Sequence, residues 1–348
     1  MNRTPLAALC ALALAASPAL AQQAYVPGNP YLVVESGQRF NRLQDAIFAI
    51  GDGKGTIRID PGHWDDCGVQ VAGDVTFEAA VPGKTIFTGP RNCEGKAALV
   101  LRGRSARVVG FIFADEHSSE GNQAGIRLEK GSLYVSQSWF RDSDEGILGN
   151  NDPTGKVVVE QSTFSRLGRC GGYAPCAHSI YINFYASVTV RHCRFEGGRG
   201  GHYLKSRAAR IEATDNSFDD SQGRDTNYMI DLPAGATGRI ANNWFVQGAH
   251  KENSTAMIAV AAEERHNSSA GLVIENNVAR MAPGAKDTAW VANWSADTLA
   301  LGVNELAGGI TRSTAFAQPS QAIPVTCNVT MGASFFRSLT RLLTHSHI

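Results

Sequence analysis

Two neighbouring segments in the middle of the chain, LYVSQSWF (133–140) and VVVEQSTF (157–164), share a template that recurs along most of the sequence. Inside each segment apolar and polar residues alternate, as they do in a β-strand with one buried face. Further copies follow at intervals of about 23 to 33 residues: RVVGFIF (107–113), VTVRHCRF (188–195), IEATDNSF (211–218), GRIANNWF (238–245) and GLVIENNV (271–278). A repeat of this length predicts stacked coils of short strands.

Two columns of the template hold similar side chains in successive copies. The final column is aromatic except in the last copy: Phe113, Phe140, Phe164, Phe195, Phe218, Phe245 and Val278. The column two residues earlier is small or polar: Ser138, Ser162, Cys193, Asn216, Asn243 and Asn276. Because stacked coils lie ~4.8 Å apart, like side chains would lie above one another, with phenyl rings in the interior and Asn side chains hydrogen-bonded in a turn. The columns predict an all-β fold, a right-handed parallel β-helix.

A second apolar segment follows each aromatic strand and is expected to form another sheet of the helix. These segments lie at 125–128, 146–149, 179–183, 202–207, 228–232, 256–260 and 289–294. The leucine-rich repeat pattern is absent, and a propeller blade would need about 40 residues and four strands. Coil length varies between the two strands, so the loops at 165–177 and 249–255 are expected to overhang one face.

The ends of the chain differ from the repeats. Residues 1–21 combine a basic start, an apolar stretch and an A-x-A site, and are expected to form a signal peptide cleaved after Ala21, with an uncleaved anchor as the alternative. Residues 22–310 are assigned to the β-helix domain, with an N-terminal capping helix within FNRLQDAIFAI (40–50). Residues 311–348 are expected to be an irregular tail with a candidate capping helix within 334–343.

Export implies a secreted or periplasmic location and an oxidising compartment. Two cysteine pairs are candidate disulfides there, Cys67 with Cys93 and Cys170 with Cys176. Cys193 occupies a repeat position and is expected to be a buried thiol. The cysteine spacing matches no standard zinc pattern, so neither a metal nor another cofactor is expected.

The charge balance limits the classes of partner. The chain has 32 Lys and Arg against 32 Asp and Glu, so no global field attracts nucleic acid or an anionic membrane. After the N-terminal segment no apolar stretch approaches the ~20 residues of a membrane span. We therefore expect no nucleic-acid partner, no membrane insertion and a monomer.

The repeat architecture resembles the pectate-lyase-like β-helix superfamily over nearly the whole mature chain. Around GHYLKSRAARI (201–211), DLPAG (231–235) and NNWFVQGAHKENS (242–254), the chain is similar to exported bacterial β-helix proteins that share H-x-L-K-S-R-A, a following P-x-G and a later E-N. That group mostly lacks an assigned activity, so the resemblance implies a fold and export.

The Lys-Ser pair at Lys205 and Ser206 also resembles that of the alginate lyase and chondroitinase B family, in which the Lys is the catalytic base. The chain departs from that family in two ways. Residues 230–233 stand where the family has an Arg, and glycines with one Arg at 197–201 stand where it has calcium-binding acids.

Polar residues on the second strands form a candidate site. If the Ile and Leu column points inward, Tyr181, Lys205 and Asp231 point outward on consecutive coils, ~4.8 Å apart. The candidate catalytic residues are Lys205, Tyr181, His202 and Arg207. The candidate substrate-binding residues are His178, Tyr203, Tyr228, Asp231 and Glu252.

These residue types suit β-elimination from an acidic polysaccharide. Such a reaction needs a cation for the uronate carboxylate, a base for the C5 proton and an acid for the leaving oxygen. We assign Lys205 as the base, Tyr181 or His202 as the acid, and Arg207 as the neutralising cation. The expected partner is a uronate-containing polysaccharide.

Three alternatives stay open. Lys205 and Asp231 could form an ordinary surface ion pair, and His178 and His202 could be stacked turn residues. A glycoside hydrolase would need two carboxylates, which Asp219 and Asp220 with Asp225 or Asp231 could provide, although adjacent Asp residues after a strand more often shape a turn. A non-catalytic carbohydrate-binding or cell-envelope protein would need only polar residues and exposed aromatic ones for stacking on sugars, for which the candidates are Tyr181, Tyr203, Tyr228, Trp290 and Trp294.

Overall fold

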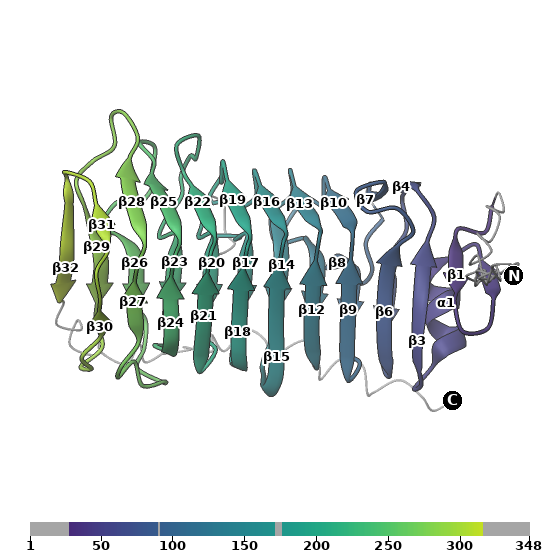
Figure 1. Ribbon diagram of the computed structural model, residues 1–348. Helices are drawn as coiled ribbons and strands as arrows, with labels where there is room; N and C mark the ends of the chain where they lie inside the picture. The colour runs from purple at the N-terminus through teal and green to yellow at the C-terminus, as the bar shows by residue number, and fades with distance from the viewer. Residues whose placement is uncertain (1–27, 90, 171–175, 316–348) are drawn as a thin grey trace, which may run out of the picture.

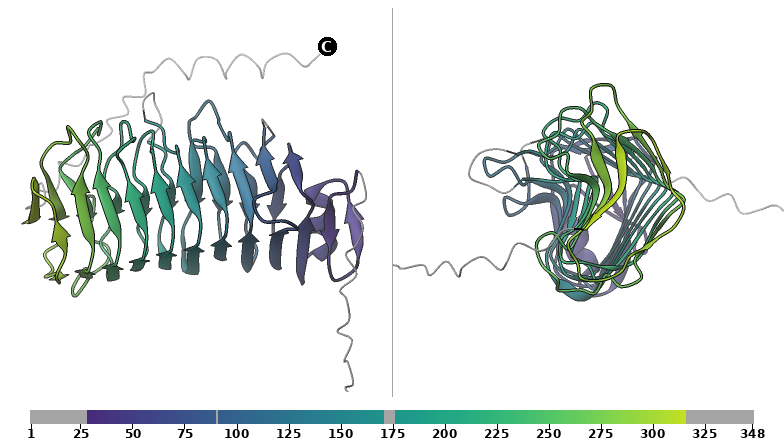
Figure 2. Two further views of the ribbon diagram at one scale, coloured as in Figure 1. Left: turned by 45° about the horizontal axis from the view of Figure 1, so that its top comes forward. Right: turned by 90° about the vertical axis from the view of Figure 1, so that its left-hand side faces the viewer.

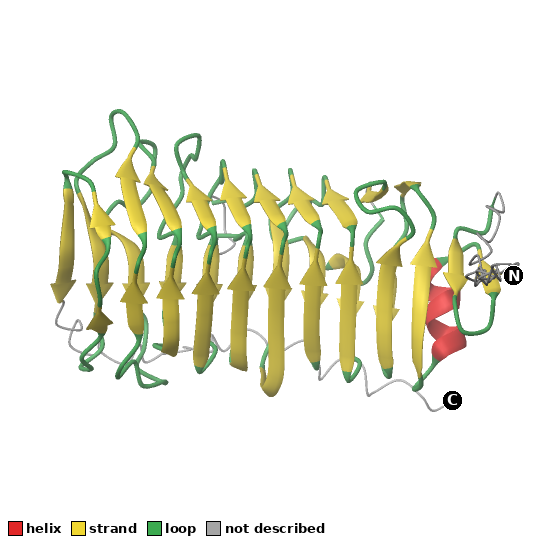
Figure 3. Ribbon diagram, in the orientation of Figure 1, coloured by secondary structure: helices red, strands yellow, loops and turns green. Residues whose placement is uncertain are grey.

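The computed structural model describes residues 28–89, 91–170 and 176–315. The chain winds along one axis from the N-terminal to the C-terminal end of an elongated solenoid (Figure 1). An end-on view shows the coils superimposed around a shared interior (Figure 2). Nearly all of the regular structure is strand (Figure 3). The all-β, right-handed parallel β-helix predicted from the repeats is confirmed.

Three sheets run the length of the helix, and we name them A, B and C. Sheet A contains β2 (Gln38–Phe40), β1 (Tyr31–Val33), β3 (Lys54–Ile59), β6 (Asp74–Ala79), β9 (Ser105–Val109), β12 (Ser132–Ser136), β15 (Asp152–Glu160), β18 (Tyr185–Arg191), β21 (Arg210–Thr214), β24 (Thr237–Ala241), β27 (Val273–Glu275) and β30 (Ala300–Leu301). Sheet B contains β4 (Gly62–Trp64), β7 (Thr85–Thr88), β10 (Phe111–Ala114), β13 (Trp139–Arg141), β16 (Thr163–Ser165), β19 (Arg194–Glu196), β22 (Ser217–Asp219), β25 (Trp244–Gln247), β28 (Val278–Met281) and β31 (Glu305–Leu306). Sheet C contains β5 (Gly68–Gln70), β8 (Ala97–Leu101), β11 (Ala124–Leu128), β14 (Glu145–Gly149), β17 (Ile180–Ile182), β20 (Leu204–Ser206), β23 (Ile230–Leu232), β26 (Ala256–Val260), β29 (Thr288–Asn293) and β32 (Ile310–Ala315).

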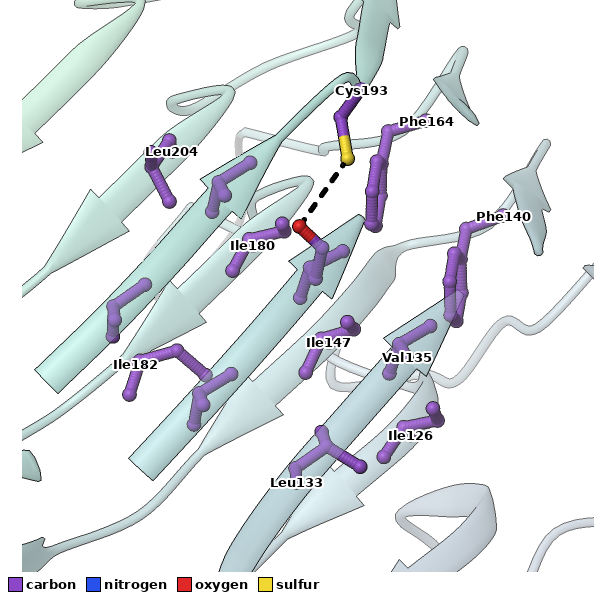
Figure 4. Packing of buried hydrophobic residues seen from close by; sticks show 14 of the residues in the cluster. Ile126, Leu133, Val135, Phe140, Ile147, Phe164, Ile180, Ile182, Cys193 and Leu204 are labelled. Atoms are coloured by element: carbon purple, nitrogen blue, oxygen red, sulfur yellow. Dashed lines mark hydrogen bonds between the residues drawn. The ribbon is translucent and has the colours of Figure 1, made fainter. Parts of the chain in front are cut away.

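The aromatic column of the repeat forms a stack inside sheet B. Phe140 and Phe164 lie face to face (Figure 4), with ring centroids 4.9 Å apart. Phe195 continues the stack at 4.9 Å from Phe164. The stack starts one coil earlier than predicted, at Phe87, and ends at Phe245. Each ring is almost fully buried, so the column supplies much of the apolar area that stabilises the coils.

The polar column forms a ladder in the turn from sheet A to sheet B. The Asn216 backbone N–H donates to Asn243 Oδ1 at 2.9 Å, and the Asn243 N–H donates to Asn277 Oδ1 at 2.9 Å. Each ladder residue follows one with positive φ, such as Asn242 at 59° and Asn276 at 56°. Asn tolerates this left-handed conformation better than most residues.

The last copy of the repeat was therefore aligned one residue out. Asn276 occupies the left-handed position and Asn277 the ladder, while Val278 pairs with Trp244 and Ala279 with Phe245. The error arose because two adjacent Asn residues fit either register, and the copy lacks the final Phe that fixed the alignment elsewhere.

The ends of the solenoid differ in part from the expectation. Helix α1 forms at Leu43–Ile50, whereas Phe40 belongs to strand β2. The helix packs Leu43 and Ile47 toward the first coil, and its first N–H donates to Asp66. At the other end β32 continues sheet C beyond the predicted boundary at 310, to Ala315. The predicted signal peptide and C-terminal helix lie outside the described residues.

Two disulfides cross-link segments outside the strands. Cys67 pairs with Cys93, and Cys170 with Cys176, as the spacing suggested. Cys193 is a buried free thiol that donates to the Val159 carbonyl oxygen at 3.6 Å (Figure 4). Disulfides of this kind are typical of an oxidising compartment. None of the helices in the described part of the chain is long and apolar enough to cross a membrane.

Candidate functional site

The register of sheet C brings the central candidate residues together. In the neighbouring strands β17, β20 and β23, Tyr181 pairs with Lys205, and Lys205 with Asp231. The adjacent Ile and Leu side chains at 180, 204 and 230 are fully buried in the core. The predicted alignment of Tyr181, Lys205 and Asp231 on consecutive strands is thus confirmed, whereas their exposure is not, since Lys205 and Asp231 are only 8% and 2% exposed.

Tyr181 and Arg207 form the polar edge of this face. The Tyr181 hydroxyl donates to Asn183 Oδ1 at 2.9 Å and accepts a hydrogen bond from the Arg207 guanidinium group. Lys205 Nζ lies 5.5 Å from the centroid of the Tyr181 ring. Burial raises the pKa of Tyr181, against the opposing effect of the two cations. A neutral phenol in this position can donate a proton.

Two glutamates that the sequence analysis did not single out complete the site. Glu263 Oε1 lies 2.6 Å from Lys205 Nζ, and Glu263 Oε2 contacts the Arg207 guanidinium group. Glu264 Oε1 lies 3.3 Å from Arg207 Nε. The side chains of both glutamates are almost half exposed, whereas those of Lys205 and Arg207 are mostly buried.

The loop after β26 holds these glutamates over sheet C. The backbone N–H groups of Glu263 and Glu264 donate to the Pro233 carbonyl oxygen at 3.0 and 2.9 Å. Asn267 Nδ2 donates to the carbonyl oxygens of Arg207, at 3.1 Å, and Gly235, at 3.0 Å. The one sequence signal for this contact is the adjacent pair of acids in a long loop between strands, but nothing in the repeat indicates the coil on which it folds.

Lys205 is a cation held between two carboxylates. Its Nζ lies 3.3 Å from Asp231 Oδ2 in addition to the contact with Glu263. Burial lowers the pKa of Lys205, but Asp231 and Glu263 outweigh this effect and raise it. Burial also raises the pKa of Asp231 to about 6. While both carboxylates are ionised and in place, Lys205 is protonated and cannot act as a base.

The two histidines stack along the helix axis. The rings of His178 and His202 are 5.0 Å apart, and Tyr228 continues the stack at 5.6 Å from His202. The His202 backbone N–H donates to His178 Nδ1 at 3.0 Å, so His178 carries its proton on Nε2. Burial lowers the pKa of His178 to about 3 and that of His202 well below its usual value. Both features agree with the alternative of stacked, backbone-bonded histidines.

Both ring nitrogens of His202 are already in contact with neighbours. Nδ1 lies 3.3 Å from the Tyr228 carbonyl oxygen, and Nε2 lies 3.3 Å from Asp231 Oδ2. The side chain of His202 is also mostly buried. Of the two predicted proton donors, Tyr181 is therefore the better placed for a ligand on the outer face.

Tyr203 does not lie on the outer face as predicted. Its side chain is 1% exposed, its ring contacts Phe195, and its hydroxyl donates to Asp220 Oδ1 at 2.7 Å. Strand β20 begins at Leu204, so the strict alternation that placed Tyr203 outside does not apply to it. Ser179 and Met229, which precede β17 and β23, are buried in the same way.

Asp220 belongs to a closed ion pair in the protein interior. It lies 3.0 Å from Lys251 Nζ, and the exposed fractions of the Asp220 and Lys251 side chains are 0% and 1%. The hydroxyl groups of Tyr203 and Thr226 donate to the same carboxylate. Asp219 accepts a hydrogen bond from the Ser221 N–H in the turn. These contacts give Asp220 a structural role and weaken the glycoside hydrolase hypothesis.

Of the remaining candidates, Tyr228 lies just before β23, and Glu252 lies in the loop before β26, where its backbone N–H donates to the Thr226 carbonyl oxygen at 2.9 Å. Glu252 is exposed and accepts a hydrogen bond from Asn227 Nδ2 at 2.6 Å. Tyr228 is partly buried, with its ring 6.3 Å from that of Trp294. Trp290, in contrast, is fully buried against Phe245 and cannot stack on a sugar. In the described residues no group of three or more His, Cys, Asp and Glu side chains is arranged to hold a metal ion.

Comparison with protein-family models and with curated proteins gave no match for this chain.

Proposed function

We propose that this protein is exported and acts on an acidic, uronate-containing polysaccharide at the outer face of β17, β20 and β23. One observation carries the proposal: the Glu263 carboxylate lies between the Lys205 ammonium group and the Arg207 guanidinium group. Two cations that share one carboxylate can also hold another of the same size. Glu263 lies on a loop with its side chain almost half exposed, so a uronate carboxylate can replace it.

The reaction that fits these groups is β-elimination. A base removes the C5 proton, the C4–O bond breaks, a C4=C5 double bond forms, and the leaving oxygen takes up a proton. Arg207 would offset the carboxylate charge that increases as the C5 proton leaves. The Tyr181 hydroxyl would protonate the leaving oxygen.

Lys205 can serve as the base only after Glu263 has left it. Replacement of Glu263 by a substrate carboxylate on Arg207 would remove one of the two anions that raise the pKa of Lys205. Lys205 would then release its proton to solvent before it takes up the C5 proton. This order of events predicts that substrate binding precedes activation of the base.

A non-catalytic polysaccharide-binding protein is the second candidate. The observation that favours it is the ion pairing of Lys205 with Asp231 and Glu263, which keeps the amine protonated. A binding protein needs only the two cations and the exposed aromatic side chains. It would retain all the contacts described above and lack turnover.

Absorbance at about 235 nm tests the choice, because each elimination creates an unsaturated uronate that absorbs there. Purified protein is mixed with alginate, pectate, glucuronan and glycosaminoglycans. We expect a rise that is lost in Arg207→Ala and Lys205→Ala and kept in Lys130→Ala, an exposed lysine far along the chain. If the absorbance does not rise with any polysaccharide while binding is still visible on affinity gels, the protein is a non-catalytic polysaccharide-binding protein.

A further inference from the structure

A second surface of the helix carries exposed tryptophans. Trp139 and Trp244 are 37% and 44% exposed, and with Phe48 they are the most exposed aromatic side chains among the described residues. Both tryptophans lie on the outer face of sheet B, in β13 and β25. An indole ring has a large apolar area to bury, and Trp is enriched at binding interfaces.

The register of sheet B places the two rings in one column. Trp139 pairs with Thr163, Thr163 with Arg194, Arg194 with Ser217, and Ser217 with Trp244. Four steps of ~4.8 Å separate the backbones of the two tryptophans by about 19 Å along the helix axis. Figure 1 shows β16, β19 and β22 side by side between β13 and β25.

A hollow of about 570 Å³ lies between these rings on the edge of sheet B. Thr163, Arg194 and Ser217 line it, together with residues of the turns that precede them, and Trp244 lies at one end. Its lining is polar but nearly balanced in charge, because Arg194 is paired with Glu196 at 2.6 Å. The lining therefore offers hydroxyl, amide and guanidinium groups to a ligand and carries little net charge.

The tryptophans are also held in place. The Trp139 indole N–H donates to Ser165 Oγ at 2.7 Å, and the Arg141 guanidinium lies 5.5 Å from the Trp139 ring centroid. The Arg280 guanidinium lies 5.3 Å from the Trp244 ring centroid. A ring fixed by a hydrogen bond, as that of Trp139 is, loses little conformational entropy when a ligand stacks on it.

We propose that the outer face of sheet B binds an extended polysaccharide chain, with sugar rings stacked on Trp139 and Trp244 and the chain crossing the polar hollow between them. The apolar C–H face of a pyranose matches an indole ring, and its hydroxyl groups match the hollow. An extended chain also repeats at about the spacing of the coils. This surface is separate from the Lys205 face, and its binding does not require catalysis.

Native gels that contain alginate, pectate or xylan test the proposal. We expect retardation by at least one polysaccharide and a loss of affinity of about tenfold in Trp244→Ala, because the variant removes the apolar area that a sugar ring would cover. Trp139→Ala is expected to act in the same direction, and Phe48→Ala, which removes an exposed ring from α1, is the matched control. Circular dichroism checks the fold of each variant.

Salt separates this surface from the Lys205 face. Binding on sheet B relies on stacking and hydroxyl contacts, so it should persist at roughly 0.5 M salt, where exposed charges are strongly screened, and in Arg207→Ala. The proposal is overturned if no polysaccharide retards the protein, or if both tryptophan variants bind as the wild type does. Light scattering gives one further overturning outcome, a dimer that dissociates when the tryptophans are replaced.

Discussion

Two lysine–aspartate pairs lie in neighbouring coils of this helix and differ in how completely they are enclosed. Lys251 and Asp220 are almost fully buried, and two hydroxyl groups also donate to that carboxylate. Lys205 is 10% exposed, Asp231 Oδ1 is buried without a partner, and the third member, Glu263, reaches in from a half-exposed loop. The buried pair of Lys251 and Asp220 needs no ligand to balance its charges. Lys205, in contrast, also contacts the carboxylate of Glu263, which the carboxylate of a ligand can replace.

Removal of the lysine from the enclosed pair should have the largest effect on stability. Lys251→Met leaves the Asp220 carboxylate buried without its cation, which we expect to lower the free energy of unfolding by about 3–5 kcal/mol. Urea denaturation measures this change. Arg239→Met, which breaks a half-exposed pair with Glu275, is the control and should stay within about 1 kcal/mol. Equal losses of stability in the two variants would contradict the expected difference between a buried and a half-exposed ion pair.

The less enclosed pair, Lys205 and Asp231, should make the stability of the protein depend on pH. The pKa of Asp231 is about 6 in the folded protein against an ordinary value of 3.8, so the folded state binds more protons between these values. The contribution of Asp231 to stability therefore falls as the pH rises from about 4 to about 6, by about 3 kcal/mol in total.

Asp231→Asn should remove this dependence. The stability of the variant relative to the wild type is expected to increase across the same pH window, as measured by denaturation at four pH values. Asp225→Asn, at an exposed turn residue, controls for the change in net charge. A difference that stays constant with pH, or that falls, would be the contrary result.

Tyr203→Phe separates a structural tyrosine from a ligand-binding one. The variant removes one donor from the enclosed Asp220 carboxylate, and we expect a loss of about 2 kcal/mol, the usual range for a hydrogen bond to a charged group. Polysaccharide retardation on affinity gels should not change, because the ring is buried. If the variant keeps its stability but binds polysaccharide more weakly, Tyr203 contacts the ligand after all.

The smallest stability change is expected at Glu263. Its carboxylate is almost half exposed, so Glu263→Ala should alter the free energy of unfolding by no more than about 1 kcal/mol. Thermal denaturation, with Glu305→Ala as an exposed control, measures the effect. A loss of stability as large as that of Lys251→Met would show that the Glu263 carboxylate is held as firmly as the buried pair of Lys251 and Asp220.

The repeat predicted the parts of the site that lie on strands. Tyr181, Lys205 and Asp231 occupy equivalent positions of one template, and stacking alone aligns them. It failed at Tyr203, because a residue just outside a short strand follows the turn and not the alternation. It also could not find Glu263, since the contact with Arg207 spans 56 residues and depends on the path of one irregular loop.

The enclosed pair of Lys251 and Asp220 was not predicted, for a related reason. Lys251 reaches Asp220 from a loop that the sequence analysis treated as an overhang on the surface. Polar residues in loops gave no periodic signal, and only the structure shows that these two turn inward. Loop length and composition therefore indicated where coils vary but not which loop side chains are buried.

The claim that Glu263 occupies the place of a substrate carboxylate is tested most directly by calorimetry. Oligogalacturonate and oligomannuronate are titrated into the wild type, Glu263→Ala and Arg207→Ala at low salt. We predict that Glu263→Ala binds one of them about three- to tenfold more tightly than the wild type, because no internal carboxylate has to be displaced. Arg207→Ala is expected to lose this site and to keep no more than the salt-resistant binding on sheet B. Unchanged or weaker binding by Glu263→Ala, or no binding by any of the three proteins, would contradict the account.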